Sequence, residues 1–330
     1  MDKLQEHVYL TETILRILKQ NRITTILDFL QEDAEKLSTL TKLNLPQILE
    51  IRQDIFNKHS ANLISGSTLF VNNITCKKFI PTGINSLDTI LEGGLPVGLI
   101  TEICGLAGSG KSQLCMQLAI NSVMGSNYTI LYIDTKGDFS AVRIQKILEA
   151  HGLSHKDMAV IMLNIRVVYI WNIEELIKLL ENIKNDVLKI ENVSMIIVDS
   201  LPCLTFQHFG DNNTIGLTYL NRVINYSRYL SKVFQMGFIF VNIQTRWIDQ
   251  DISDPEDTEC AYSIKDLTYT EKRTRCLGKY WKTIPALVLV LEKNKLENNI
   301  CDTVKVLVTK HINPTEVKSC FIKVNAQGVS

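Results

Sequence analysis

The sequence Gly-Leu-Ala-Gly-Ser-Gly-Lys-Ser at residues 105–112 decides the fold class. It matches the phosphate-binding loop pattern G-x-x-x-x-G-K-[S/T] in full. The apolar run at residues 99–104 is typical of a buried strand that leads into the loop. Leu114, Cys115 and Leu118 then form the apolar stripe of a helix that leaves it. Strand, glycine loop and helix therefore stand in the order that a phosphate-binding loop requires.

This loop predicts a site for the phosphates of ATP. Its glycines let successive backbone N–H groups close around a phosphate at the positive end of the helix. Lys111 supplies a compact charge for the β- and γ-phosphates, and the Ser112 hydroxyl is a ligand for Mg²⁺. The alternative, a glycine-rich turn with an incidental lysine, leaves the flanking strand and helix unexplained. The predicted ATP-binding residues here are Gly105, Leu106, Ala107, Gly108, Ser109, Gly110, Lys111 and Ser112.

A carboxylate at the end of a neighbouring strand completes a Mg²⁺ site of this kind. Asp199 follows an apolar run at residues 195–198 that is long enough to be a strand buried on both faces. Asp134 follows a similar run at residues 130–133 and is the competing candidate. We predict Asp199 as the metal ligand, together with Ser112.

The remaining pattern predicts an α/β fold with a small helical domain in front. Apolar runs alternate with helical stretches, which is typical of a mainly parallel sheet covered by helices. We expect an all-α N-terminal domain at residues 1–58, a linker at 59–76 and an ATPase core at 77–330. Helices are expected to end at Asn21 and to begin at Pro46. The expected strands are residues 99–104, 129–134, 160–163, 193–199, 238–243, 286–291 and 304–308.

Composition limits the function only weakly. Lysine plus arginine (35) equals aspartate plus glutamate (35), so a nucleic acid would have to bind a local basic patch. No apolar stretch approaches the roughly 18 residues that a membrane span needs, so we expect a soluble protein. The basic and aromatic residues near the end of the long non-periodic segment 246–283, expected to be a mobile loop, suit single-stranded DNA. These candidates are Lys272, Arg273, Arg275, Lys279, Tyr280 and Trp281, although Tyr280 and Trp281 could instead pack beneath the next strand.

Several further motifs resemble the eukaryotic RecA-like recombinases. Pro-Thr-Gly at residues 81–83, Ser-Leu-Asp at 86–88 and Gly-Gly-Leu at 93–95 resemble the start of that family's ATPase core. The N-terminal Arg-Ile-Thr-Thr at residues 22–25, the linker at 66–70 and Gly-Lys-Tyr-Trp at 278–281 most resemble the paralogue group lettered D. The resemblance covers nearly the whole chain and is weakest over residues 200–283.

The resemblance implies a mediator of homologous recombination. It implies a DNA-dependent ATPase that acts in the nucleus on single-stranded DNA, with ATP and Mg²⁺ as cofactors. The implied partners are other paralogues of the family, namely the C-lettered paralogue and the X-ray cross-complementing paralogue two. The resemblance also implies that Arg143 stacks on adenine, a task that suits a planar guanidinium. A second DNA-facing segment is implied at residues 202–215.

Two departures from the family pattern shape these expectations. The active recombinases carry Asp-Thr-Glu-Gly at the strand end, where the glutamate polarises the attacking water. Here Lys136 replaces that glutamate, and a lysine is not a general base at neutral pH unless its pKa is strongly lowered. The recombinases also insert a phenylalanine and, three residues later, an alanine into the next subunit, whereas Phe70 is followed at that spacing by Asn73. We therefore predict slow hydrolysis, and a hetero-oligomer in place of a filament of identical subunits.

Some alternatives stay open on the sequence alone. A self-sufficient, filament-forming recombinase conflicts with Lys136 and Asn73. A small-molecule kinase shares the phosphate loop, and a pure interaction module could keep ATP in a structural role. The residue that senses the γ-phosphate is either Asn242 or Gln244, both of which lie near the end of the strand expected at residues 238–243.

Overall fold

The computed structural model describes residues 9–59, 64–75, 78–124, 126–209, 215–249, 270–293, 302–311 and 317–330. The chain divides into two compact units, Met1–Thr75 and Cys76–Ser330. Each unit is a separate body with its own hydrophobic core.

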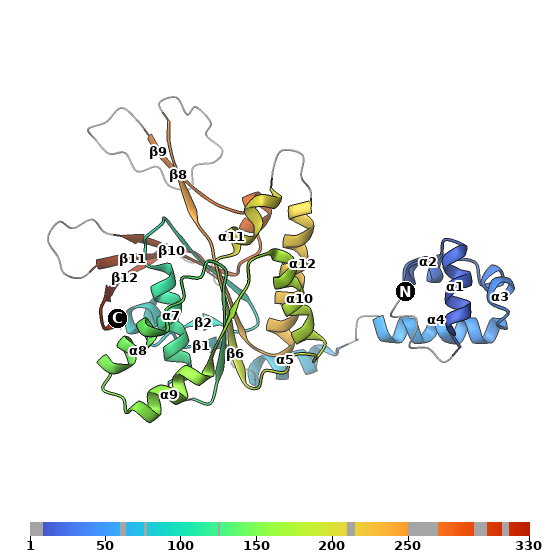
Figure 1. Ribbon diagram of the computed structural model, residues 1–330, viewed down its shortest axis with the longest axis horizontal. Helices are drawn as coiled ribbons and strands as arrows, with labels where there is room; N and C mark the ends of the chain where they lie inside the picture. Colours follow the sequence, from blue (N-terminus) through green and yellow to red (C-terminus); the bar gives the residue numbers. More distant parts are fainter. Residues whose placement is uncertain are drawn as a thin grey trace. The chain divides into compact units, whose positions relative to one another are not determined.

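All the secondary-structure elements described in the first unit are helices (Figure 1). Its helices are α1 (Glu12–Gln20), α2 (Ile26–Gln31), α3 (Ala34–Thr41), α4 (Leu45–His59) and α5 (Gly66–Thr75). The expected helix end at Asn21 and the expected helix start next to Pro46 are confirmed. A capping box between Thr25 and Asp28 starts α2, because each side chain accepts a hydrogen bond from the other residue's backbone N–H. Helix α5 lies within the residues expected to form a linker.

The second unit is built around a nine-stranded sheet with the order β13-β12-β11-β10-β3-β7-β6-β4-β5. Strands β10, β3, β7, β6, β4 and β5 run parallel, and β11, β12 and β13 continue the sheet antiparallel. The predicted mainly parallel sheet is thus confirmed. The strands of this sheet are β3 (Ile100–Gly105), β4 (Thr129–Asp134), β5 (Ile165–Tyr169), β6 (Val193–Asp199), β7 (Gly237–Val241), β10 (Leu287–Lys293), β11 (Asp302–Lys310), β12 (Lys318–Asn325) and β13 (Gly328–Val329).

Helices cover both faces of the sheet (Figure 1). One apolar cluster joins Leu114 and Leu118 of α7 to the sheet, and a second joins Leu220 and Ile224 of α12 to its other face. The remaining elements are β1 (Phe79–Ile80), α6 (Asn85–Ile90), β2 (Leu95–Pro96), α7 (Lys111–Val123), α8 (Ala141–Ala150), α9 (His155–Asn164), α10 (Ile173–Lys184), α11 (Leu201–Thr205), the 3-10 turn η2 (Phe206–His208), α12 (Ile215–Val233), β8 (Gln244–Asp249), β9 (Thr270–Arg275) and α13 (Gly278–Lys282).

Two expectations about these elements are wrong. Residues 160–163 belong to the C-terminal part of α9 rather than to a strand, and the strand β5 begins afterwards at Ile165. The segment 246–283 is also not one loop, because β8 pairs antiparallel with β9, and α13 follows. The segment 202–215 is largely helical, with α11 and η2, and its residues 210–214 lie outside the described residues.

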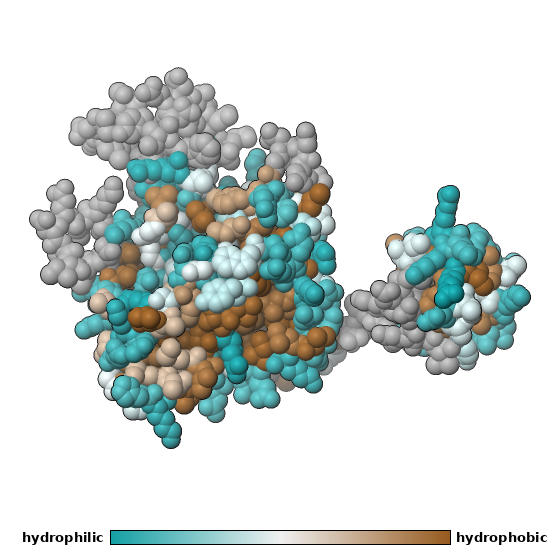
Figure 2. All heavy atoms as spheres, in the orientation of Figure 1, coloured by the Kyte–Doolittle hydropathy of each residue, from teal (hydrophilic) through white to brown (hydrophobic). Residues whose placement is uncertain are grey.

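The surface of the second unit is mixed in character. On the visible face, hydrophilic side chains dominate the upper part and hydrophobic ones gather in the lower part (Figure 2).

Tyr169 and Trp171, at the end of edge strand β5, are 53% and 62% exposed, and their rings stack 6.5 Å apart. Within the described ranges, no helix is both long and apolar enough to cross a membrane.

Candidate nucleotide site

The phosphate loop connects β3, which ends at Gly105, to α7, which begins at Lys111. Gly110 has φ 91°, a left-handed conformation that glycine adopts without strain. A Cβ atom on Gly105 would lie 2.5 Å from the carbonyl oxygen of Leu291 and 2.6 Å from Ser109 Oγ. The loop borders a cavity of about 430 Å³ that is lined by residues 107–113 and by Lys136, Asp138 and Ile243.

Lys111 folds back over this loop. Its ammonium donates hydrogen bonds to the carbonyl oxygens of Gly105 (3.0 Å) and Leu106 (2.7 Å). Burial lowers the pKa of Lys111, and the nearby positive charge of Lys136 lowers it further. The side chain is therefore held next to the cavity in a place where an anion would relieve an unfavourable positive charge.

Asp199 lies at the end of β6 and is 2% exposed. Its Oδ2 accepts a hydrogen bond from the Tyr132 hydroxyl at 2.9 Å. Its Oδ1 lies 2.8 Å from the ammonium of Lys136, in an ion pair without good hydrogen-bond alignment. Oδ1 of Asp199 thus already contacts a cationic side chain, and the assignment of Asp199 and Ser112 as ligands for Mg²⁺ stays a prediction.

The carboxylate of Asp134 makes different contacts from that of Asp199. Its carboxylate accepts hydrogen bonds from the backbone N–H groups of Lys136 (3.0 Å), Gly137 (3.0 Å) and Phe139 (2.8 Å). These bonds hold the turn that follows β4. Because its carboxylate is committed to this turn, Asp134 does not compete with Asp199 for a metal.

Lys136 is fixed at the mouth of the site. Its side chain is 25% exposed, and its ammonium also lies 3.8 Å from Asp138 Oδ2. Burial favours the neutral amine, but the contact with Asp199 outweighs it, so the pKa of Lys136 is raised above its ordinary value. A lysine in this position remains protonated at neutral pH and cannot accept a proton.

Arg143 lies on α8, close to the first turn of α7. Its Nε donates to Gln113 Oε1 at 2.8 Å, and its Nη groups donate to the carbonyl oxygens of Asn325 and Ala326. Arg143 is not among the residues that line the phosphate-loop cavity, so its predicted stacking on adenine stays a prediction.

The two sensor candidates differ clearly. Asn242 is fully buried, and its amide donates to Glu102 Oε1 (2.7 Å) and to the carbonyl oxygen of Cys276 (3.0 Å). Gln244 begins β8, and its buried side-chain oxygen accepts no hydrogen bond. The sensor assignment stays a prediction, and Gln244 is the candidate whose side-chain oxygen accepts no hydrogen bond among the described residues.

Glu102 forms the centre of a buried network at the base of the β8–β9 hairpin. Its Oε2 accepts a hydrogen bond from Arg275 at 3.0 Å, and neither side chain is more than 10% exposed. Burial raises the pKa of Glu102, although Arg275 and Asn242 oppose that shift. Strand β3, which leads into the phosphate loop, is thereby tied to the hairpin.

The structure removes some of the predicted DNA-binding residues from the surface. Trp281 is fully buried and packs edge-on against Phe240, with ring centroids 5.4 Å apart, so its predicted contact with DNA is wrong. Arg275 is bound to Glu102, and Arg273 pairs with Glu292 at 3.0 Å. Lys279 and Tyr280 are exposed on α13, and Lys272 is half-buried on β9.

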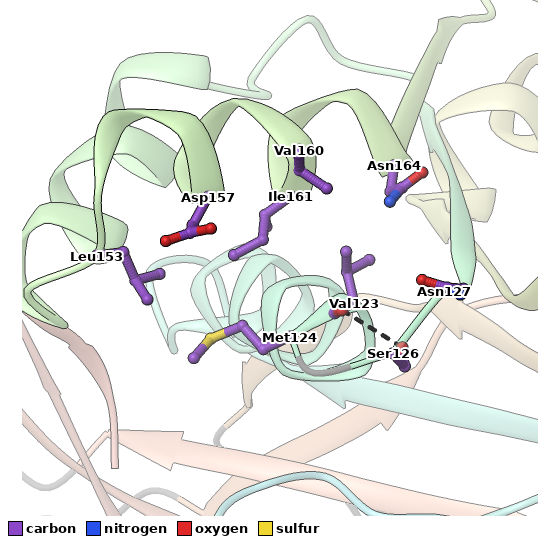
Figure 3. Close-up of a pocket in the computed structure, with 9 residues that line it drawn as sticks. All are labelled: Val123, Met124, Ser126, Asn127, Leu153, Asp157, Val160, Ile161 and Asn164. Carbon is purple, nitrogen blue, oxygen red and sulfur yellow. Dashed lines mark hydrogen bonds between the residues drawn. The ribbon is translucent and has the colours of Figure 1, made fainter.

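A second cavity lies between α7 and α9, at the opposite end of α7 from the phosphate loop (Figure 3). It measures about 460 Å³. Figure 3 shows Val123, Met124 and Ile161 pointing into the space between the two helices. Helix α7 has 13 residues, so about 20 Å of helix separate this cavity from the phosphate loop. It is not part of the nucleotide site.

The comparisons with known proteins agree with this geometry. The family Rad51 matches residues 76–323, which is most of the chain. The chain belongs to the Rad51 family. Among Rad51-family relatives, the DNA repair protein RAD51 homolog 4 of Bos taurus is 25% identical over 306 residues, covering 91% of this chain and 88% of the relative. The same homolog from Mus musculus is 27% identical over 242 residues, covering 72% of this chain and 74% of the relative.

A comparison with solved structures gives the same architecture. The crystal structure of the RadB recombinase superposes with a TM-score of 0.58 and 19% identity, covering 75% of this chain and 97% of that one. The resemblance to the group lettered D, the fourth homolog, is thus confirmed by the sequence relatives. Membership of the Rad51 family also argues against the small-molecule kinase.

Two contacts of the site were missed by sequence reasoning. The ion pair between Lys136 and Asp199 and the bond from Tyr132 to Asp199 both join the β4 region to β6. Both strands were predicted from the sequence. A single sequence does not give the order of strands in the sheet, so it could not show that β4 lies beside β6.

Proposed function

We propose that this chain is an ATP-binding, DNA-binding mediator of homologous recombination and DNA double-strand break repair. It acts in the nucleus within a complex of recombinase paralogues on single-stranded DNA, and it hydrolyses ATP slowly. The observation that carries the proposal is the phosphate loop together with Lys136 in the lining of one cavity. Lys136 stands where a catalytic base is expected, and it is ion-paired with Asp199. Rad51-family membership and relatives named as DNA repair proteins support the biological role.

Nucleotide binding follows from the groups around the cavity. The backbone N–H groups of residues 105–112 and the ammonium of Lys111 bind the β- and γ-phosphates. We assign Arg143 to stacking on the adenine on the resemblance alone. Ser112 and Asp199 would hold Mg²⁺, which supplies charge neutralisation for the phosphates when it is bound.

Slow turnover follows from Lys136. A general base needs a lone pair that can take a proton from the attacking water. Lys136 stays protonated because Asp199 holds its charge at 2.8 Å. Water can still attack a positioned phosphate, but without the roughly 10²- to 10⁴-fold that a general base typically contributes.

Binding to DNA and to partners involves other surfaces. Lys272, Lys279 and Tyr280 lie at or near the β8–β9 hairpin, and Gln244 at its base can relate nucleotide state to DNA. Phe70 and Val71 of α5 are 67% and 55% exposed, so they suit an apolar contact with another chain. We propose the C-lettered paralogue and the X-ray cross-complementing paralogue two as partners, on the resemblance alone.

One experiment tests the nucleotide part. ATP binding and hydrolysis are measured for the wild-type chain and for Lys111→Ala, with and without single-stranded DNA and at two salt concentrations. We expect tight binding that Lys111→Ala abolishes, and slow turnover that DNA raises and salt suppresses. Turnover as fast as that of an active recombinase would contradict the slow ATPase, and binding without any response to DNA would leave only a nucleotide-gated scaffold.

A matched pair of aromatic variants tests the DNA part. Tyr280→Ala should weaken binding of single-stranded DNA by about 1–3 kcal/mol without unfolding the protein, as expected for a stacking residue. Trp281→Ala should destabilise the fold by about 3–5 kcal/mol because it empties a core position. Unchanged DNA affinity in Tyr280→Ala would remove this residue from the proposed DNA surface.

A further inference from the structure

Two lysine side chains face the same nucleotide cavity. Lys111 reaches it from the start of α7 and Lys136 from the turn after β4, and both belong to its lining. Two cations in one cavity are unfavourable unless an anion is bound between or beside them.

The second lysine is fixed in place by the residue that would bind the metal. The Lys136 ammonium lies 2.8 Å from Asp199 Oδ1, the carboxylate oxygen without an aligned hydrogen bond. The other oxygen is taken by the Tyr132 hydroxyl. Lys136 is among the described residues that line the cavity, whereas Asp199 is not. The ammonium therefore stands between the carboxylate and the cavity.

This arrangement changes what a divalent cation can contribute. A Mg²⁺ ion that used Asp199 would have to displace an ammonium from a nearly buried carboxylate, or share the site with it. The Lys136 ammonium adds one positive charge to the lining of this cavity, beside the charge of Lys111. Lysine is a compact point charge that suits this task.

We propose that Lys136 takes over part of the role of the divalent cation, so that this site binds ATP with little dependence on Mg²⁺. The inference rests on the proposed ATP binding and deepens it. It identifies metal-free nucleoside triphosphate as a ligand of the site, and it makes Lys136 a phosphate-binding residue.

The test compares nucleotide affinity with and without metal. Binding of a fluorescent ATP analogue is titrated in excess EDTA and in excess Mg²⁺, for the wild type, Lys136→Gln and Lys146→Gln. Glutamine removes the charge and keeps a polar side chain that is one atom shorter. Lys146 is exposed on α8, so its variant controls for the loss of one positive charge. Thermal unfolding confirms that each variant is folded.

We expect the wild type and Lys146→Gln to bind about equally in both buffers, within about threefold. In EDTA, the nucleotide affinity of Lys136→Gln should be about tenfold or more below that of the wild type. In Mg²⁺ most of this affinity should return, because the metal can then reach Asp199. Bound Mn²⁺, counted by electron paramagnetic resonance in the presence of nucleotide, should rise in Lys136→Gln relative to the wild type.

Two other outcomes overturn the inference, and they can be told apart. If the nucleotide affinity of the wild type falls by about tenfold or more in EDTA, as that of Lys136→Gln does, the lysine does not replace the metal. The proposed ATP binding is then unaffected. If the wild type binds no nucleotide in either buffer, the proposed ATP binding fails as well.

Discussion

On one side of the nucleotide cavity, the phosphate loop at residues 105–112 provides backbone N–H groups and the Lys111 ammonium for a triphosphate. On the other side, the ends of β4 and β6 carry Lys136 ion-paired to Asp199, where the active recombinases are expected to carry a glutamate. The two sides lie on parallel strands of one sheet. The difference teaches that the phosphate loop can be kept intact while the residue at the strand end changes, so a family member can keep ATP binding and reduce the activation of water.

The largest expected effect tests the loop side. Lys111→Ala should lower ATP affinity by about 100-fold, because the ammonium is the main charge on the loop side of the cavity. Isothermal titration calorimetry measures this, with Lys146→Ala as the control for charge. Near-wild-type affinity in Lys111→Ala would break the comparison, since the loop side would then not be the binding side.

The next effect tests the strand-end side. Lys136→Glu should raise the rate of ATP hydrolysis in Mg²⁺ by about tenfold or more, because a carboxylate can polarise the attacking water. Single-turnover hydrolysis measures the rate, and Lys136→Gln serves as the control that removes the charge without adding a base. Equal rates in the two variants would mean that the missing base is not what limits turnover.

A smaller effect concerns the stability of the ion pair itself. Asp199→Asn should destabilise the fold by about 1 kcal/mol, less than the loss for a fully buried pair, because Lys136 can turn toward solvent. Urea unfolding measures the change. The double variant Asp199→Asn with Lys136→Met should recover much of it, and additive losses would show that the two residues do not interact.

The smallest effect concerns Asp138, whose carboxylate is 68% exposed and 3.8 Å from Lys136. Asp138→Asn should change stability by less than about 0.5 kcal/mol, as is typical of exposed ion pairs. It should raise ATP affinity by about twofold at low salt, because it removes a negative charge beside the phosphates. Fluorescence titration at two salt concentrations measures this, and a loss of affinity would place Asp138 among the residues that help binding.

The parts of the site that are continuous in sequence could be predicted from it. The glycines, Lys111 and Ser112 are adjacent in the chain, and their spacing alone carries the geometry of the loop. The strands that precede Asp134 and Asp199 were also identified, because long apolar runs are typical of buried parallel strands. That the carboxylate of Asp134 binds backbone N–H groups, whereas that of Asp199 contacts the Lys136 ammonium, depends on the fold and could not be predicted.

Other parts could not be predicted because two signals conflict or a signal is weak. The apolar residues 160–163 fit a strand, but they continue α9, where Met158 and Ile161 are buried at helical spacing. Strands β8 and β9 are rich in polar residues, so they lack the alternation that indicates a strand. Tyr280 and Trp281 are neighbours with opposite exposures, and a single sequence does not say which of them faces the core.

The network around Glu102 has a consequence for how this chain can change over evolutionary time. A carboxylate with no exposed surface is costly without its cation, so loss of Arg275 alone should be selected against. Related chains that carry an uncharged residue at the position of Glu102 should also lack arginine at the position of Arg275. Paired substitution at these two positions, far apart in the sequence, would record their contact in the history of the family.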